Sequence, residues 1–157
     1  MSRSTVETAL LAVLEGVSGV EHVYSGMRSP TDPTAFITEV AGTTRTQAWM
    51  VWRSKTEQFD ASNSPVPIAN HYELFVKHTF EIEGHYGFLD DTTESEWQNL
   101  LDAILTAFNN QRTIGGWYAW PLTLQEVGYR AFGTLAGAHY CKIEITIGEI
   151  VSGLNPQ

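Results

Sequence analysis

The stretch HYELFVKHTFEIE, residues 71–83, decides the fold because its apolar and polar side chains alternate. Neighbouring side chains in a strand point to opposite faces of the sheet. One face receives Tyr72, Leu74, Val76, His78, Phe80 and Ile82, and the other receives His71, Glu73, Phe75, Lys77, Thr79, Glu81 and Glu83. The stretch therefore predicts a strand with one face on an apolar core and one polar face.

The end of the chain repeats this pattern over residues 138–151. The two alternating sets are His139, Cys141, Ile143, Ile145 and Ile147 against Tyr140, Lys142, Glu144 and Thr146. Two further strands are predicted, one at residues 46–54, which are apolar on both faces, and one at residues 122–132. Residues 55–70, KTEQFDASNSPVPIAN, are polar and contain two prolines, so they predict a long mobile loop.

Two amphipathic helices accompany the strands. Apolar residues recur at three- and four-residue steps near the N-terminus and again over residues 93–111. Each helix opens on a capping-box pattern, Ser4 with Glu7 and Thr93 with Glu96. The order helix, strands, helix, strands is typical of an α+β fold. We expect a single domain over residues 1–157, with an antiparallel sheet of about four strands and two amphipathic helices packed on one face.

The composition excludes several classes of function. Hydrophobic residues make up 43% of the 157 residues, while charged residues make up only 17%, which indicates assembly with other subunits. The net charge of −9 argues against electrostatic capture of nucleic acid or anionic lipid. The single cysteine cannot form an intrachain disulfide, and no window holds the ~20 apolar residues that span a bilayer. We therefore expect a protein of a reducing compartment that does not interact with membranes.

No pattern of reactive side chains indicates catalysis. His71 and His78 point to opposite faces of one strand, so they do not converge on a metal ion. His139 and Cys141 share a face, but that face continues into isoleucines, which favours packing over a nucleophilic thiol. We predict no enzyme activity and no catalytic, cofactor-binding or metal-binding residues.

Four tryptophans are hard to bury together in a domain of this size, because each ring removes about 200 Å² from water. They are Trp49, Trp52, Trp117 and Trp120. Two interpretations stay open: all four fill the core, or some of them form a subunit or partner interface, where tryptophan is enriched. Phe59, inside the predicted loop, is a further candidate for such an interface.

Several features of residues 71–151 occur together. They are the long alternating strand ending in Gly84-x-Tyr86, the acidic turn Asp90-Asp91, a helix from Trp97 to Phe108, Arg130-x-Phe132-Gly133, His139-Tyr140-Cys141 and Glu149. With this combination, the segment resembles the tail terminator, or tail completion, proteins of long-tailed bacteriophages. The first 70 residues share only an opening helix and an early strand with that family.

The resemblance implies a structural virion protein. Such proteins form a homo-oligomeric ring, usually hexameric, that caps the tail tube protein, ends its polymerisation and joins the tail to the head-neck connector or stopper protein. This implies a place at the tail-neck junction of the virion, and in the host cytoplasm during assembly. DNA passes through such a ring without specific binding. Two interpretations of the polar strand face with Glu73, Glu81 and Glu83 stay open: an ordinary solvated sheet face, or the channel side of such a ring, because negative charge repels phosphate.

Other functions stay open at this point. The chain could be another neck component, such as an adaptor or stopper, or a tail tube protein. The alternative from a different class is a small ligand-binding or enzymatic α+β domain with a pocket near Tyr72, His78 and Cys141.

Overall fold

A computed structural model describes residues 3–26, 45–60, 71–87, 93–115, 117–132 and 136–154. In chain order the elements are α1 (Arg3–Glu15), β1 (Val23–Ser25), β2 (Gln47–Asp60), β3 (His71–Tyr86), α3 (Thr93–Asn109), β4 (Thr113–Ile114), β5 (Trp117–Ala119), β6 (Thr123–Phe132) and β7 (Ala136–Leu154). The two helices and the four long strands fall on the segments predicted from the sequence. The α+β class is therefore confirmed.

The strands form one seven-stranded sheet in the order β1-β2-β3-β7-β5-β4, with β6 pairing separately with β7. The long strands pair antiparallel, but β1 pairs with β2 in parallel. The prediction of an antiparallel sheet of about four strands is thus corrected to a mixed sheet with seven described strands. The three strands missed are only two or three residues long, which is too short to show an alternating pattern.

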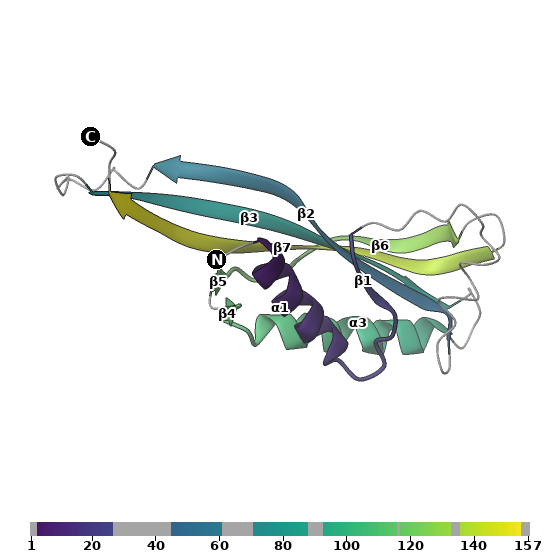
Figure 1. Cartoon of the computed structure of the whole chain (residues 1–157). Helices are drawn as coiled ribbons and strands as arrows, with labels where there is room; N and C mark the ends of the chain where they lie inside the picture. The colour runs from purple at the N-terminus through teal and green to yellow at the C-terminus, as the bar shows by residue number, and fades with distance from the viewer. Residues whose placement is uncertain are drawn as a thin grey trace.

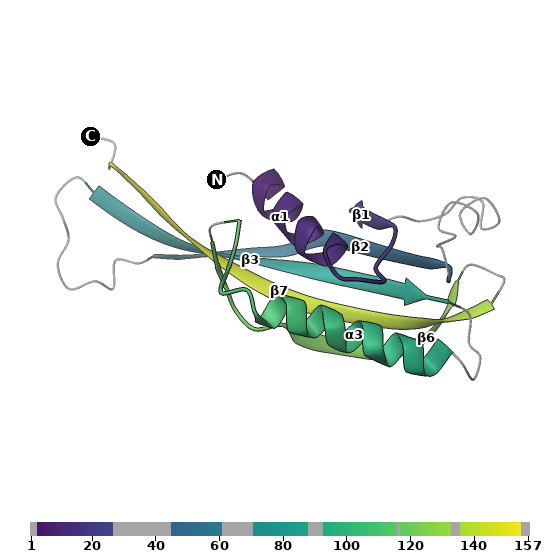
Figure 2. The same cartoon turned by 90° about the horizontal axis from the view of Figure 1, so that it is seen from below.

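Both helices pack against the same face of the sheet, as expected (Figure 1). Seen from below, α1 lies near β1 and β2 while α3 runs along β7 (Figure 2). The helices contribute the buried residues Val6, Leu10, Leu14, Trp97, Leu100, Leu101, Ile104 and Phe108 to the core. The alternating strands supply the other side of this core, including Phe80, Ile82, Cys141, Ile143, Ile145 and Ile147. The molecule therefore has two layers, and the second face of the sheet carries no described helix.

The core is organised around a tryptophan that lies over a glycine. Trp49 of β2 is fully buried and is the register partner of Gly84 in β3. A Cβ atom at Gly84 would lie 2.3 Å from Cζ3 of Trp49, so only glycine leaves room for the ring. Trp49 also stacks on Trp97 of α3, with 5.9 Å between the ring centroids. This stack joins the sheet to the helix layer.

Beyond the helices, β2, β3 and β7 continue as a three-stranded arm (Figure 1). The pairing of β2 with β3 runs on to Asp60↔Leu74, and that of β3 with β7 begins at His71↔Leu154. Residues 55–60 are therefore strand, which corrects the start of the loop predicted at 55–70, while residues 61–70 lie outside the described residues. A strand that no helix covers does not need the apolar alternation by which strands are predicted.

Candidate functional site

The face of the sheet opposite the helices, called the polar face below, carries an open groove of about 690 Å³. Its lining includes Lys55, Glu57, Lys77, Glu81, Trp120 and Glu144. These residues come from β2, β3, β7 and the segment that leads into β6. They alternate along the strands with residues of the core, so the same two-residue period that buries one face exposes the groove on the other.

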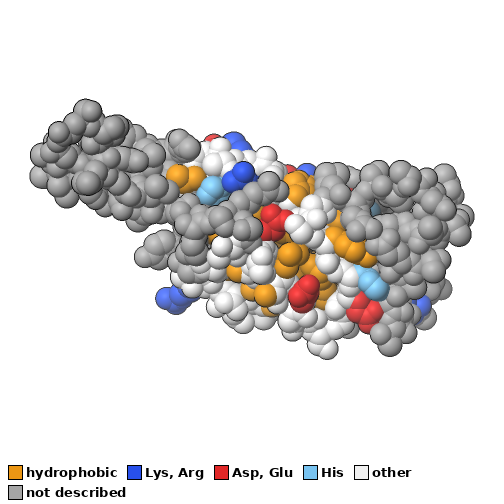
Figure 3. Space-filling view, viewed as in Figure 1, with side chains coloured by type: hydrophobic (Ala, Val, Ile, Leu, Met, Phe, Trp, Pro, Cys, Tyr) orange, Lys and Arg blue, Asp and Glu red, His pale blue; other side chains and the backbone are white. Residues whose placement is uncertain are grey.

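Charges on the polar face are mixed. The register places three lysines and five glutamates there among the described side chains: Lys55, Lys77, Lys142, Glu57, Glu81, Glu83, Glu126 and Glu144. Lys142 Nζ lies 3.3 Å from Glu81 Oε2, and Lys55 Nζ lies 2.7 Å from Glu57 Oε1. Figure 3 has the viewpoint of Figure 1, and the few charged side chains coloured there lie apart among hydrophobic and uncharged ones. The polar face is therefore only slightly acidic.

The three glutamates predicted to line a channel all belong to β3. The side chains of Glu81 and Glu83 lie on the polar face, and each is 17% exposed. Glu83 Oε1 is 3.1 Å from Nε2 of His85. Glu73 pairs in register with Ser152, and its side chain is outside the described residues. Glu81 and Glu83 thus share one surface, and their position in a channel stays a prediction.

The tryptophans divide between core and surface. Trp49 is fully buried under the helices, so the core interpretation holds for this residue. Trp52 is half-buried on the polar face. Trp120 is 38% exposed, and Lys77 Nζ lies 5.2 Å from the centroid of its ring. The side chains of two other predicted interface residues are outside the described part of the chain: Trp117 in β5 and Phe59 in β2.

Exposed apolar side chains that the sequence does not single out lie on β6, on the helix side of the sheet: Leu124, Val127 and Tyr129. In the described part of the chain, the large hydrophobic side chains that are exposed are Trp120, Leu124, Val127 and Tyr129. All four belong to β6 or to the segment just before it. Among the described strands β6 pairs only with β7, so β6 is an edge strand. Its sequence predicts a strand, but nothing in the sequence marks that strand as an edge.

Cys141 and its near neighbour His139 are both buried. Burial raises the pKa of the Cys141 thiol to about 12, so this thiol stays protonated at neutral pH and is a poor nucleophile. His139 is 1% exposed, and its Nε2 atom lies 2.8 Å from the hydroxyl oxygen of Thr93. Its Nδ1 atom lies 3.5 Å from Glu94 Oε2. The prediction that Cys141 serves packing agrees with this burial.

The pocket predicted near Tyr72, His78 and Cys141 is not the groove described above. His78 and Cys141 point to the helix side of the sheet, whereas the groove lies on the polar face. The Nδ1 atom of His78 lies 3.1 Å from the hydroxyl oxygen of Thr56.

Within the described ranges, no three His, Cys, Asp or Glu side chains are grouped as metal ligands would be. The described helices include none with the length and apolarity needed to cross a membrane.

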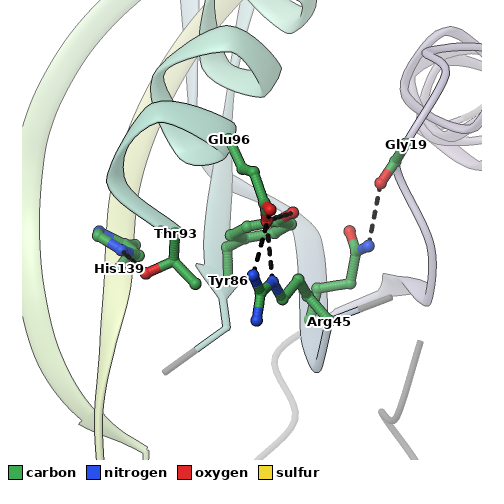
Figure 4. A network of polar contacts seen from close by, with 7 residues as sticks. Gly19, Arg45, Tyr86, Thr93, Glu96 and His139 are labelled. Atoms are coloured by element: carbon green, nitrogen blue, oxygen red, sulfur yellow. Dashed lines mark hydrogen bonds and ion pairs between the residues drawn. The ribbon is translucent and has the colours of Figure 1, made fainter. Parts of the chain in front are cut away.

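Polar contacts attach the start of α3 to the sheet (Figure 4). Arg45 donates from Nε to Glu96 Oε2 at 2.8 Å and from Nη2 to Glu96 Oε1 at 3.1 Å. Tyr86, at the end of β3, donates its hydroxyl to the same Oε2 at 3.2 Å. Burial, followed by the hydrogen bond and the charge of Glu96, raises the pKa of Tyr86 above its usual 10.0. The sequence predicts Glu96 only as a capping residue, so these contacts are a new role for it.

We compared the chain with protein families, curated proteins and solved structures, and only the solved structures gave a match. Neither a protein-family model nor a curated protein matches the chain. Among solved structures, the chain is similar to the sheath/tube terminator of an extracellular contractile injection system, PVC, determined by cryo-EM in the extended state. The TM-score is 0.51 at 12% sequence identity, over 100% of this chain and 58% of that terminator. The chain thus spans less than two thirds of the neighbour's length, and the similarity supports a terminator-like fold.

Proposed function

We propose that this chain is a structural protein that terminates a tail or tail-like tube. In this proposal, the subunits form a closed hexameric ring that caps the tube, ends its polymerisation and joins it to the next component. The observation that carries the proposal is the similarity of the whole chain to a sheath/tube terminator, at a TM-score of 0.51. The low content of charged residues, 17%, agrees with a protein whose surface is largely covered in an assembly.

The two faces of the sheet suggest how a subunit is placed in the ring. The helices cover one face, so that face forms the outer wall in our proposal. The polar face then lines the channel, with Glu73, Glu81 and Glu83 among its residues. Its described charges are mixed, three lysines against five glutamates, and Glu81 is paired with Lys142. Such a surface does not hold phosphate groups strongly, which suits a passage that DNA crosses without specific binding.

The proposed partners follow from this position. The tail tube protein lies on one side of the ring, and the head-neck connector or stopper protein lies on the other. The protein would then reside at the tail-neck junction of the virion, after assembly in the host cytoplasm. No step of this role requires catalysis or a cofactor.

Polymerisation of the tail tube protein in the presence and absence of this chain tests the proposal. We expect tubes of limited length whose ends carry a ring visible by negative-stain microscopy, because a capped end cannot add subunits. The protein should act at amounts far below those of the tube protein. Tube lengths that do not change even at equimolar amounts would contradict the proposed function.

The channel assignment has its own test. In the double variant Glu81→Lys and Glu83→Lys, we expect unchanged ring assembly but slower DNA delivery, because the new positive charges attract phosphate. The matched control is Glu15→Lys with Asp102→Lys, since both side chains are exposed on the helix layer. Delivery as fast as in the control would show that the polar face does not line the channel.

A further inference from the structure

The sheet has two edges that lack a described partner strand. At one edge, β6 pairs only with β7 among the described strands. At the other edge, β1 pairs with β2 only from Trp49 to Val51, so no described strand pairs with the outer side of Trp52–Asp60. An uncovered edge presents a row of backbone N–H and C=O groups that can pair with another strand.

The sequence of β6 protects this edge only in part. Natural edge strands are protected by lysine and other charged side chains, by proline, by β-bulges or by being very short. β6 is 10 residues long, TLQEVGYRAF, and has neither lysine nor proline, although it carries Glu126 and Arg130 and an irregular register between Leu124 and Glu126. Its side chains Leu124, Val127 and Tyr129 are 40%, 42% and 61% exposed. A long edge with exposed apolar side chains is typical of a surface that another chain covers.

Strand directions allow the two edges of two copies to meet. The pairings β2 with β3, β3 with β7 and β7 with β6 are all antiparallel, so β6 runs opposite to β2. If two copies stand side by side in the same orientation, β6 of one copy lies antiparallel to β2 of the next. The alternation of directions then continues across the contact. Each copy uses both edges, so the contact repeats from copy to copy, and it closes a ring where the rotation between copies divides a full turn.

The two edges also lie at different ends of the sheet (Figure 1). β6 pairs with residues 136–144 of β7, whereas the uncovered part of β2 pairs with residues 74–81 of β3 on the side of the arm. Copies joined through these edges are therefore displaced along the strands. A sheet that closes on itself requires such a stagger, because its strands tilt relative to the axis.

We propose that β6 binds the Trp52–Asp60 edge of a second copy of this chain, and that this pairing is the subunit contact of the ring. The inference rests on the proposed function. Glu126 lies opposite the neighbour's Lys55 in the register that we propose. Both side chains are exposed and both belong to the polar face, so opposite charges meet across the contact.

The register of β2 shifts between Arg53 and Lys55, so that Ser54 is an extra residue. The proposed register therefore places Gly128 opposite the neighbour's Trp52. A Cβ atom at Gly128 would meet nothing within 4 Å in the described part of the chain, which leaves room for an indole ring. Trp52 is half-buried in the isolated subunit and becomes covered in this arrangement. The contact therefore gives Trp52 the interface role that the sequence analysis left open.

An exchange of charges tests the contact. Glu126→Lys and Lys55→Glu should each weaken self-association about tenfold, because like charges then face each other, and the double variant should restore it. Asp102→Lys on the exposed side of α3 is the matched control. Sedimentation velocity over a concentration series measures association, with and without tail tubes, and thermal melts verify that each variant folds.

A second variant tests the edge without a change at Lys55. Val127→Lys places a charge on the exposed edge, as natural proteins do to prevent pairing, and should weaken self-association at least as much. Variants that assemble into rings like the unaltered protein would overturn the β6 contact and leave the proposed function intact. Variants that keep the ring but lose tube capping would assign the edge to the tube protein instead of a second copy. Failure of the unaltered protein to assemble, alone or on tubes, would overturn both proposals.

Discussion

The two faces of the sheet have opposite environments although the same strands form them. On the face under the helices, Trp49, Phe80 and Ile143 are at most 1% exposed. On the polar face, the side chain of Lys55 is 61% exposed and Trp120 is 38% exposed. The difference shows that α1 and α3 bury the helix side of the central strands, while the polar face keeps polar and aromatic groups at the surface and the β6 edge keeps Leu124, Val127 and Tyr129 exposed. Stability should therefore depend on the covered part of the first face, and assembly on the polar face and the β6 edge.

The largest difference between the two faces is expected from their tryptophans. Trp97→Ala removes a ring that is 1% exposed and stacks on Trp49, so it should lower the free energy of unfolding by about 3–5 kcal/mol. Trp120→Ala removes a partly exposed ring and its contact with Lys77, and should cost about 1 kcal/mol or less. Chemical denaturation of both variants measures the difference. Equal losses would contradict the one-sided core.

The glycines provide a finer comparison. Gly84→Ala forces a Cβ atom against the ring of Trp49 and should destabilise the fold by about 1–3 kcal/mol. Gly128→Ala on the edge strand meets no described atom within 4 Å and should change stability by about 0.5 kcal/mol or less. Thermal melts of the two variants measure this difference in stability. A tolerated alanine at position 84 would show that Trp49 does not lie over this glycine.

The smallest effect is expected where α3 is attached to the sheet. Glu96→Gln weakens a partly exposed ion pair with Arg45 and should cost about 1 kcal/mol or less. It should also lower the pKa of Tyr86, which stays above its usual value because burial is the largest cause of the increase. Titration of tyrosinate absorbance, with Tyr86→Phe as the reference, measures this change. A Tyr86 pKa that does not move would remove Glu96 as a cause.

The raised pKa of Tyr86 also predicts how stability depends on pH. The unfolded chain loses the tyrosine proton near pH 10, before the folded chain does. The free energy of unfolding should therefore be insensitive to this group below that pH and fall as the pH rises toward the folded pKa. Glu96→Gln should reduce this alkaline loss.

The long helices and strands can be predicted from the sequence because their apolar residues recur at regular spacings. The two-residue alternation of residues 71–83 places Glu81 and Glu83 on one face, and the helical stripe from Trp97 to Phe108 marks the buried side of α3. Residues 55–60 contain one apolar residue, Phe59, so they lack an alternating pattern although they form part of β2. The parallel pairing of β1 is set by tertiary contacts, and three residues cannot reveal it.

The site is less predictable because it depends on which strands become neighbours. The sequence makes Trp49 and Trp120 equal candidates for the core or for an interface. In the structure, Trp49 lies beside Gly84 of the neighbouring strand β3, whereas Trp120 precedes the edge strand β6. The pairing of Glu81 with Lys142 likewise depends on the register between β3 and β7, which turn geometry and packing decide. The exposed side chains of β6 indicate a contact surface only once β6 is known to be an edge strand.

The central claim is that this chain assembles into a ring that ends a tube. Its most direct test is the solution mass by light scattering over a concentration series, followed by negative-stain imaging of the protein alone and with tail tubes. We expect a hexamer with a central hole, in solution or at the tube ends. A monomer at every concentration, together with tube ends that carry no added density, would contradict it.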